Sequence, residues 1–277
     1  MKFAMCQELF EGWDWERQCR FLKEVGYEGV EVAPFSLGPQ PTQLSKQERQ
    51  KLKAQAEDCG LQVVGLHWLL AKTEGFHLTT ADKAVREATA QYLADLGDLC
   101  ADLGGRVMVF GSPAQRSLQP GVSYEQAMEH AAEVFSSCLP RLADRGVVLC
   151  MEPLTKKETD FINTCEQAVE LIQRVDHPNL RLHQDVKAML GAETEPIPLL
   201  IEKYASFLEH FHANDANLLG PGMGETDFGP IFQALLKINY QGWVSVEVFD
   251  STPGMEQIAR SSLRYMKETL ERVRGQD

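Results

Sequence analysis

The sequence has no long hydrophobic run, and this absence limits what the chain can be. Hydrophobic residues make up 44% of its 277 residues, yet no window approaches the roughly 18 consecutive apolar residues of a membrane span. The first eight residues also lack the apolar stretch of a secretory signal. We therefore expect no membrane partner and a cytoplasmic location.

Paired cysteines are missing as well. The seven cysteines stand at positions 6, 19, 59, 100, 138, 150 and 165, and no two of them have the C-x-x-C spacing. The sequence thus gives no sign of a zinc ribbon or of a disulfide framework. Unpaired thiols of this kind are compatible with the reducing cytoplasm.

Basic residues are scarce relative to acidic ones. The chain has 27 lysines and arginines against 40 aspartates and glutamates, which gives a formal net charge of −13. A surface with this charge repels the phosphates of nucleic acids. We expect no nucleic-acid partner, and small neutral substrates or cations instead.

No linker rich in Pro, Gly or Ser divides the chain, and short apolar runs alternate with longer amphipathic ones from end to end. The pattern is typical of repeated βα units with a parallel sheet. Eight candidate strands can be counted, at residues 2–7, 29–33, 62–66, 107–110, 147–151, 180–184, 207–212 and 243–246. A barrel of eight such units needs about 250 residues. The sequence predicts an α/β fold, a single (β/α)8 TIM-barrel domain over residues 1–277.

Four potential metal ligands follow or end four consecutive predicted strands. They are Glu152, Asp185, His212 and Glu247, separated by 33, 27 and 35 residues, about one βα unit each. Strand ends in such a barrel meet at one mouth, so these side chains are expected to converge. Three carboxylates and one imidazole form a mostly oxygen site, which favours Mn²⁺, Mg²⁺ or Co²⁺. We expect one divalent ion, with Mn²⁺ as first choice.

Several motifs resemble the sugar phosphate isomerase/epimerase family. They are Glu152-Pro153-Leu154 with residues 158–164, residues 212–215, the loop 220–224, and residues 240–247. That family has a xylose isomerase-like barrel and includes ketose 3-epimerases, hydroxypyruvate isomerases and inosose dehydratases. The resemblance covers nearly the whole chain and is most specific from about residue 147 to 250.

The resemblance implies a role for individual residues. Positions matching Glu152, Asp185, His212 and Glu247 bind the metal in that family, and the two glutamates move the proton in its epimerases. The position matching Glu158 contacts the substrate. The implied reaction is the isomerisation or epimerisation of a small ketose through an enediolate, whose charge the metal would stabilise as a Lewis acid.

The sequence departs from the family pattern where the substrate is expected. Ala188 stands at the position of a common histidine, and Leu218 at that of an arginine found in ketose 3-epimerases. Thr155 and Lys157 also replace Asn and Tyr. Two nearby residues are candidate substrate contacts instead, Lys187 after Asp185 and His183 before it. These departures leave the particular sugar open.

Two further candidates follow the third predicted strand. His67 and Trp68 could bind the hydroxyls and the apolar face of a sugar, although His67 could equally be a satisfied core histidine. His210 alternates with His212 along one strand, so we expect it to support that residue without binding the metal.

Three other functions remain open. A metal-dependent lyase of the inosose dehydratase type would use the same enolisation and then expel a β-hydroxyl. An AP-endonuclease-like nuclease has a similar barrel, but Ala188, the lack of an Asp-x-His pair after His212 and the acidic charge argue against it. A barrel that only binds sugar is the third. The family resemblance also predicts a homodimer or homotetramer.

Overall fold

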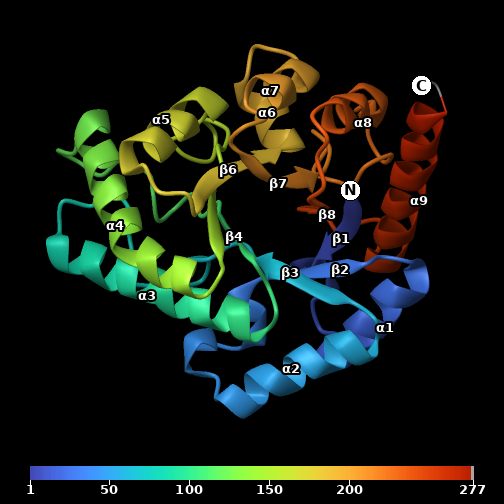
Figure 1. Cartoon of the computed structure of the whole chain (residues 1–277), viewed down its shortest axis with the longest axis horizontal. Helices are drawn as coiled ribbons and strands as arrows, with labels where there is room; N and C mark the ends of the chain where they lie inside the picture. The colour runs from blue at the N-terminus through green and yellow to red at the C-terminus, as the bar shows by residue number, and fades with distance from the viewer. Residues whose placement is uncertain (276–277) are drawn as a thin grey trace.

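A closed barrel of eight parallel strands forms the centre of the protein (Figure 1). The computed structural model describes residues 1–275. The strands are β1 (Lys2–Cys6), β2 (Gly29–Val32), β3 (Gln62–Leu66), β4 (Val107–Phe110), β5 (Val148–Met151), β6 (Leu180–Asp185), β7 (Leu208–Ala213) and β8 (Trp243–Val246). Each strand pairs with the next, and β8 pairs with β1. The predicted (β/α)8 barrel is confirmed, and each strand boundary lies within one residue of its prediction.

Helices surround the strands on the outside of the barrel (Figure 1). They are α1 (Trp15–Val25), α2 (Lys46–Asp58), α3 (Lys83–Asp102), α4 (Tyr124–Asp144), α5 (Cys165–Val175), α6 (Val186–Ala192), α7 (Ile197–Lys203), α8 (Phe228–Lys237) and α9 (Met255–Arg274). Several begin at a side-chain cap, such as the capping box of Ser45 and Glu48 at α2, which satisfies free backbone N–H groups. Within residues 1–275, no helix is long and apolar enough to cross a membrane.

The hydrophobic core lies between the strands and the helices. Parallel strands are covered on both faces, so most strand residues are buried. One close approach needs glycine: a Cβ on Gly65 of β3 would lie 1.8 Å from the carbonyl oxygen of Val107 in β4. We infer that the described elements form one domain, because the first strand, β1, pairs with the last, β8, and closes the barrel.

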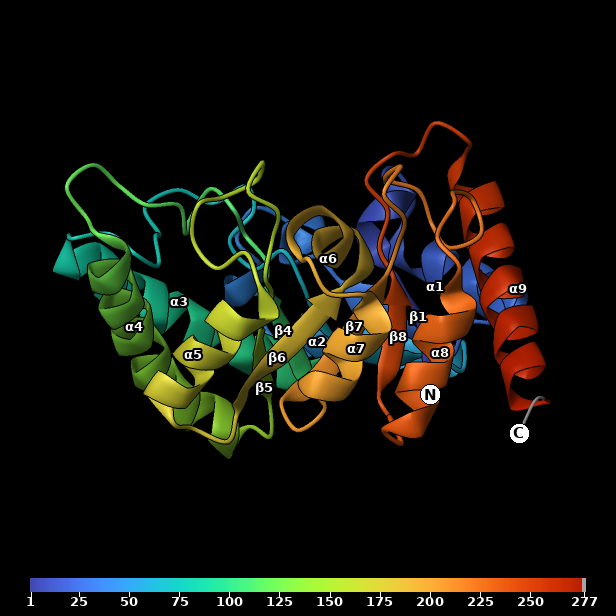
Figure 2. The ribbon, with the colours of Figure 1, turned by 90° about the horizontal axis from the view of Figure 1, so that it is seen from above.

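All eight strands run in the same direction, so their carboxyl ends open onto one mouth. Figure 2 shows the long loops after the strands on one side of the barrel, away from the N-terminus. The predicted loop at residues 220–224 lies here, between β7 and α8. Barrels of this type carry their functional sites at this mouth.

Candidate metal centre and substrate cavity

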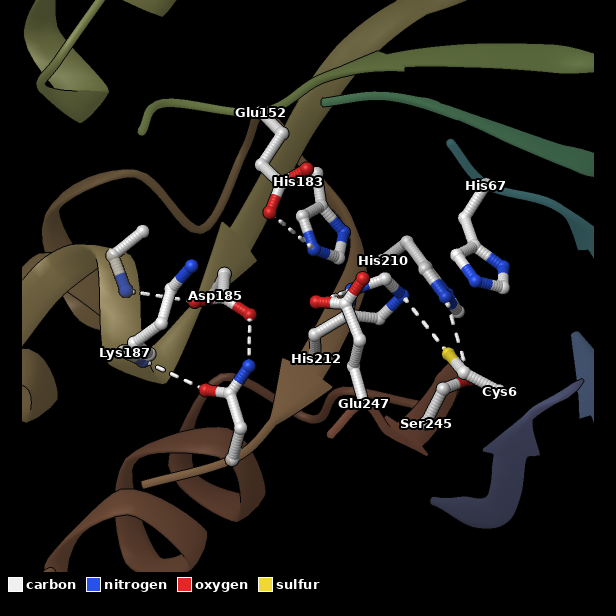
Figure 3. Close-up of polar contacts among 12 residues, drawn as sticks. Cys6, His67, Glu152, His183, Asp185, Lys187, His210, His212, Ser245 and Glu247 are labelled. Atoms are coloured by element: carbon white, nitrogen blue, oxygen red, sulfur yellow. Dashed lines mark hydrogen bonds and ion pairs between the residues drawn. The ribbon is translucent and has the colours of Figure 1, made fainter. Parts of the chain in front are cut away.

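The structure brings the four predicted ligands to the mouth of the barrel (Figure 3). Glu152 directly follows β5, Asp185 is the last residue of β6, His212 is next to the last residue of β7, and Glu247 directly follows β8. All four side chains are buried. The prediction that consecutive strand ends would gather these residues at one place agrees with this arrangement.

The ligand atoms of these residues lie close to one another. Oxygen or nitrogen atoms of Glu152, Asp185 and His212 come within 4.8 Å of one another, and the ring of His183 joins the same group. Glu247 adjoins it through His212, with Oε2 3.3 Å from His212 Nδ1. Neither of these two atoms has a hydrogen-bond partner among the described residues. A shared cation would satisfy both of them.

Asp185 is held in place by its neighbours. It caps α6 by accepting a hydrogen bond from the Ala188 backbone N–H at 2.7 Å. Its second oxygen accepts a hydrogen bond from the Asn214 side-chain amide. Asn214 in turn accepts from the Lys187 backbone N–H. The carboxylate is therefore oriented by the first turn of α6 and by Asn214, which directly follows β7.

His212 is oriented by a residue that sequence reasoning missed. Glu31, from the middle of β2, is fully buried and accepts hydrogen bonds from His212 Nε2 at 3.0 Å and from His210 Nε2 at 2.8 Å. A hydrogen bond at Nε2 leaves Nδ1 of His212 free to act as a ligand. His210 and His212 thus share the Glu31 carboxylate, and the supporting role of His210 stays a prediction. The signal available was an acidic residue inside an otherwise apolar strand.

Charge within this network is stabilised by pairing. Burial alone would raise the pKa of Glu31, but the His210 and His212 imidazoles hold it well below its usual range. Burial opposes the charge on His212 in the same way, yet Glu31 and Glu247 raise its pKa well above its ordinary value. Glu31 and His212 thus stabilise each other's charged form.

The carboxyls of Glu152, Asp185 and Glu247 have very different pKa values. Burial, together with Glu247 and Asp185, raises the pKa of Glu152 well above its usual value. Burial also raises the pKa of Asp185 to about 6, against the effect of Lys187. Burial opposes ionisation of Glu247 too, but His212 outweighs it and lowers the pKa to about 2. Crowded buried carboxyls of this kind are stabilised by a cation, so this donor set fits a divalent metal ion.

A cavity of about 300 Å³ opens above these carboxylates. Residues from five strand ends line it, among them Trp68, Gly111, Glu152, Glu158, Lys187, Glu247 and Phe249. Trp68 donates a hydrogen bond from its indole N–H to Glu247 Oε1 at 2.7 Å and stacks on Phe249, with ring centroids 6.1 Å apart. The cavity thus combines an acidic floor with an aromatic wall.

The predicted substrate contacts Glu158 and Lys187 form an ion pair in this cavity. Lys187 Nζ lies 2.8 Å from Glu158 Oε1 and 4.0 Å from the centre of the Phe249 ring. Thr155 donates a hydrogen bond to the other oxygen of Glu158 at 2.8 Å. Burial opposes both charges, but the Lys187 ammonium lowers the pKa of Glu158, and Asp185 and Glu158 raise that of Lys187. Leu218 lies in a groove farther out and is exposed.

Two predicted substrate contacts lie beneath the cavity and are not among its lining residues. His67 is fully buried, with Nε2 2.6 Å from Glu8 Oε2 and Nδ1 3.8 Å from Glu31 Oε1. His183 is also fully buried and lies beside Glu152 and His212 (Figure 3). Of the pair after β3, Trp68 alone reaches the cavity.

Arg116 is a second residue that the sequence did not point to. Its guanidinium is fully buried and donates hydrogen bonds to the carbonyl oxygens of Glu152 at 2.6 Å and Ile162 at 3.3 Å. It therefore fixes the backbone at the point where Glu152 leaves β5. A single arginine in a loop gives no sequence signal for such a role.

The fold and the site together define a class of protein. The chain belongs to the xylose isomerase-like TIM barrel family, which it matches over residues 19–269. The resemblance inferred from the motifs is thereby confirmed.

Individual relatives fall within the same family. The chain is 26% identical over 244 residues to the D-psicose 3-epimerase of Ruminiclostridium cellulolyticum, covering 85% of this chain and 80% of that one. It is 24% identical over 274 residues to a probable ketose 3-epimerase of Synechocystis sp., covering 90% and 88%. The crystal structure of D-psicose 3-epimerase with D-tagatose from Clostridium cellulolyticum H10 has the same fold, with a TM-score of 0.87, 22% identity and coverage of 98% and 99%.

Proposed function

We propose that the protein is a divalent-metal-dependent epimerase of a small ketose. The observation that carries the proposal is the convergence of Glu152, Asp185, His212 and Glu247 beneath a cavity of about 300 Å³. The unpartnered atoms His212 Nδ1 and Glu247 Oε2 support a cation at this place. The ketose 3-epimerase relatives support the choice of substrate class and reaction.

Glu152, Asp185, His212 and Glu247 would hold the ion, with Mn²⁺ as first choice and Mg²⁺ or Co²⁺ as alternatives. When bound, such an ion acts as a Lewis acid that stabilises negative charge on the carbonyl and hydroxyl oxygens of a ketose. The protein keeps the ligands in position: Glu31 orients His212, and the Asn214 amide orients Asp185.

The two glutamates would move the proton. Both line the cavity, and they come from β5 and β8, which are separated by β6 and β7. A carboxylate on one face of a sugar can remove the proton from the carbon beside the carbonyl, and a carboxyl on the other face can return it. Return from the opposite face inverts that carbon, which is an epimerisation. Trp68 holds one oxygen of Glu247 in place for this role.

Glu158 and Lys187 would bind the hydroxyl groups of the sugar. They are already paired in the cavity, so their charges are positioned before a substrate arrives. Trp68 and Phe249 offer an apolar wall for a C–H face of the sugar. Self-association stays a prediction.

Metal content and turnover test the proposal together. Wild type, Glu247→Gln and a control, Glu209→Gln, would be purified, and their metal measured by elemental analysis after dialysis against Mn²⁺. Glu209 lies near the start of β7 and lines a cavity at the opposite end of the barrel, so it makes a matched control. We expect about one ion per chain and ketose epimerisation in wild type and control, and weakened binding in Glu247→Gln. No bound ion and no conversion with Mn²⁺, Mg²⁺ or Co²⁺ would refute the proposal.

A further inference from the structure

His183 is a buried imidazole beside the metal-facing carboxylates, for which the family resemblance implies no metal role. It lies in β6 two residues before Asp185, so the two side chains point to the same side of the strand, the barrel interior. It is fully buried and lies outside the lining of the substrate cavity. A direct contact with the sugar therefore does not account for its place.

Neither ring nitrogen of His183 has a hydrogen-bond partner among residues 1–275. The rings of His212 and His210 lie beside it, with centroids 4.1 Å and 5.3 Å away. Buried polar groups are normally paired, and one with no partner calls for an explanation. His210 differs in this respect, because its Nε2 is already bonded to Glu31 at 2.8 Å.

The position of His183 suits a ligand of the same ion. Its ligand atom lies within 4.8 Å of those of Glu152, Asp185 and His212, and its Nε2 is 4.0 Å from Glu152 Oε1. Metal–nitrogen and metal–oxygen bonds of about 2.0–2.2 Å place two ligands on opposite sides of one ion about 4 Å apart. Figure 3 shows the His183 ring directed toward Glu152 from below.

We propose that His183 coordinates the same divalent ion as Glu152, Asp185 and His212, as a second imidazole ligand. This inference rests on the metal site of the proposed function. Imidazole suits later first-row ions better than Mn²⁺ or Mg²⁺. A second imidazole therefore shifts the preference of the site toward Co²⁺, within the set of ions that the carboxylates accept.

Pulsed electron paramagnetic resonance on the Mn²⁺-loaded protein tests the coordination directly. With ¹⁵N-labelled histidine, the spectrum counts the imidazole nitrogens bound to the ion. We expect two in wild type, one in His183→Gln, and two in the control His177→Gln, which removes an imidazole before the start of β6, at the opposite end of the barrel. One bound nitrogen in wild type would overturn the proposal, and this result does not depend on how any variant folds.

Metal affinities give an independent measurement. Competition titrations with a chelator should give a fall of about 100-fold for Co²⁺ and about 10-fold for Mn²⁺ in His183→Gln. Equal losses for both ions, or none, would overturn the role of His183. A wild type that binds an ion through one imidazole and epimerises a ketose refutes this inference alone, whereas a wild type that binds no ion refutes the proposed function.

Discussion

Gly111 directly follows β4 and lines the cavity, and adding one methyl group there should impair metal binding. A Cβ at this position would lie 1.8 Å from Glu152 Oε2 and 2.9 Å from its Cδ. Because an ordinary carbon–oxygen contact is about 3.3 Å, the carboxylate oxygen would have to move by about 1.5 Å. Functional groups must be held to within about 0.5 Å of their working position. The Gly111→Ala change should therefore displace Glu152, a proposed metal ligand.

The effect should fall on function far more than on stability. The clash involves the far end of a side chain, which can rotate away, so we expect the free energy of unfolding to change by less than about 1 kcal/mol. A ligand misplaced by more than 1 Å should lower kcat/KM by about 100-fold, and metal affinity should fall with it. Thermal unfolding, metal titration and ketose epimerisation would be measured on the same preparations.

Gly97→Ala provides the matched control. Gly97 lies in α3, away from the mouth, and its added Cβ would meet the side chain of Leu142 at 2.8 Å. This variant should bind metal and turn over ketose like wild type. Undiminished metal affinity and activity in Gly111→Ala would refute the assignment of Glu152 as a ligand held against this glycine.

Three other predictions follow from the same site. Glu31→Gln removes the charge that orients His212 and leaves one imidazole N–H without an acceptor. Metal affinity should therefore fall about 10- to 100-fold in a chelator competition assay. Unchanged affinity would contradict the orienting role of Glu31. Lys187→Met should lower kcat/KM about 10- to 100-fold at saturating metal, because a charged contact to the substrate is lost. The control Lys156→Met, at an exposed lysine, should leave kcat/KM unchanged. Equal kcat/KM values for Lys187→Met and wild type would exclude Lys187 from the site. Asp185, with its pKa raised to about 6, must lose a proton to bind metal, so affinity measured by calorimetry should rise from pH 5 to 7. The folded chain holds the Asp185 proton more tightly than the unfolded chain, so the metal-free protein should lose stability as pH rises from about 4 to 6. A gain in stability over this pH range would contradict the raised pKa of Asp185.

The barrel and the four candidate metal ligands could be predicted because both depend on local patterns in the sequence. Glu152 and Glu247 each follow an apolar run directly, and parallel strands in a barrel all end at one mouth. Once eight such runs are counted, the convergence of their terminal residues follows from topology. The positions of Asp185 and His212 could be predicted by the same reasoning.

Other parts of the site depend on contacts that no local pattern reveals. Glu31 stands inside an apolar strand, and its partner His212 is 181 residues away in the sequence. His67 and His183 point beneath the cavity because of how the strands tilt inside the barrel, and the sequence pattern does not show this tilt. Arg116 acts on backbone carbonyl oxygens, which every residue has, so its partners could not be identified before the loops were folded.

The proposed epimerisation requires a proton to leave one carbon of the ketose and a proton to return to its opposite face at the metal site. The most direct measurement is nuclear magnetic resonance of candidate ketoses incubated in D2O with the Mn²⁺-loaded enzyme. We expect an epimeric product with deuterium at the inverted carbon. This deuterium uptake should be lost in Glu247→Gln but not in Glu209→Gln. A product without solvent deuterium, or no exchange with any supplied divalent ion, would contradict it.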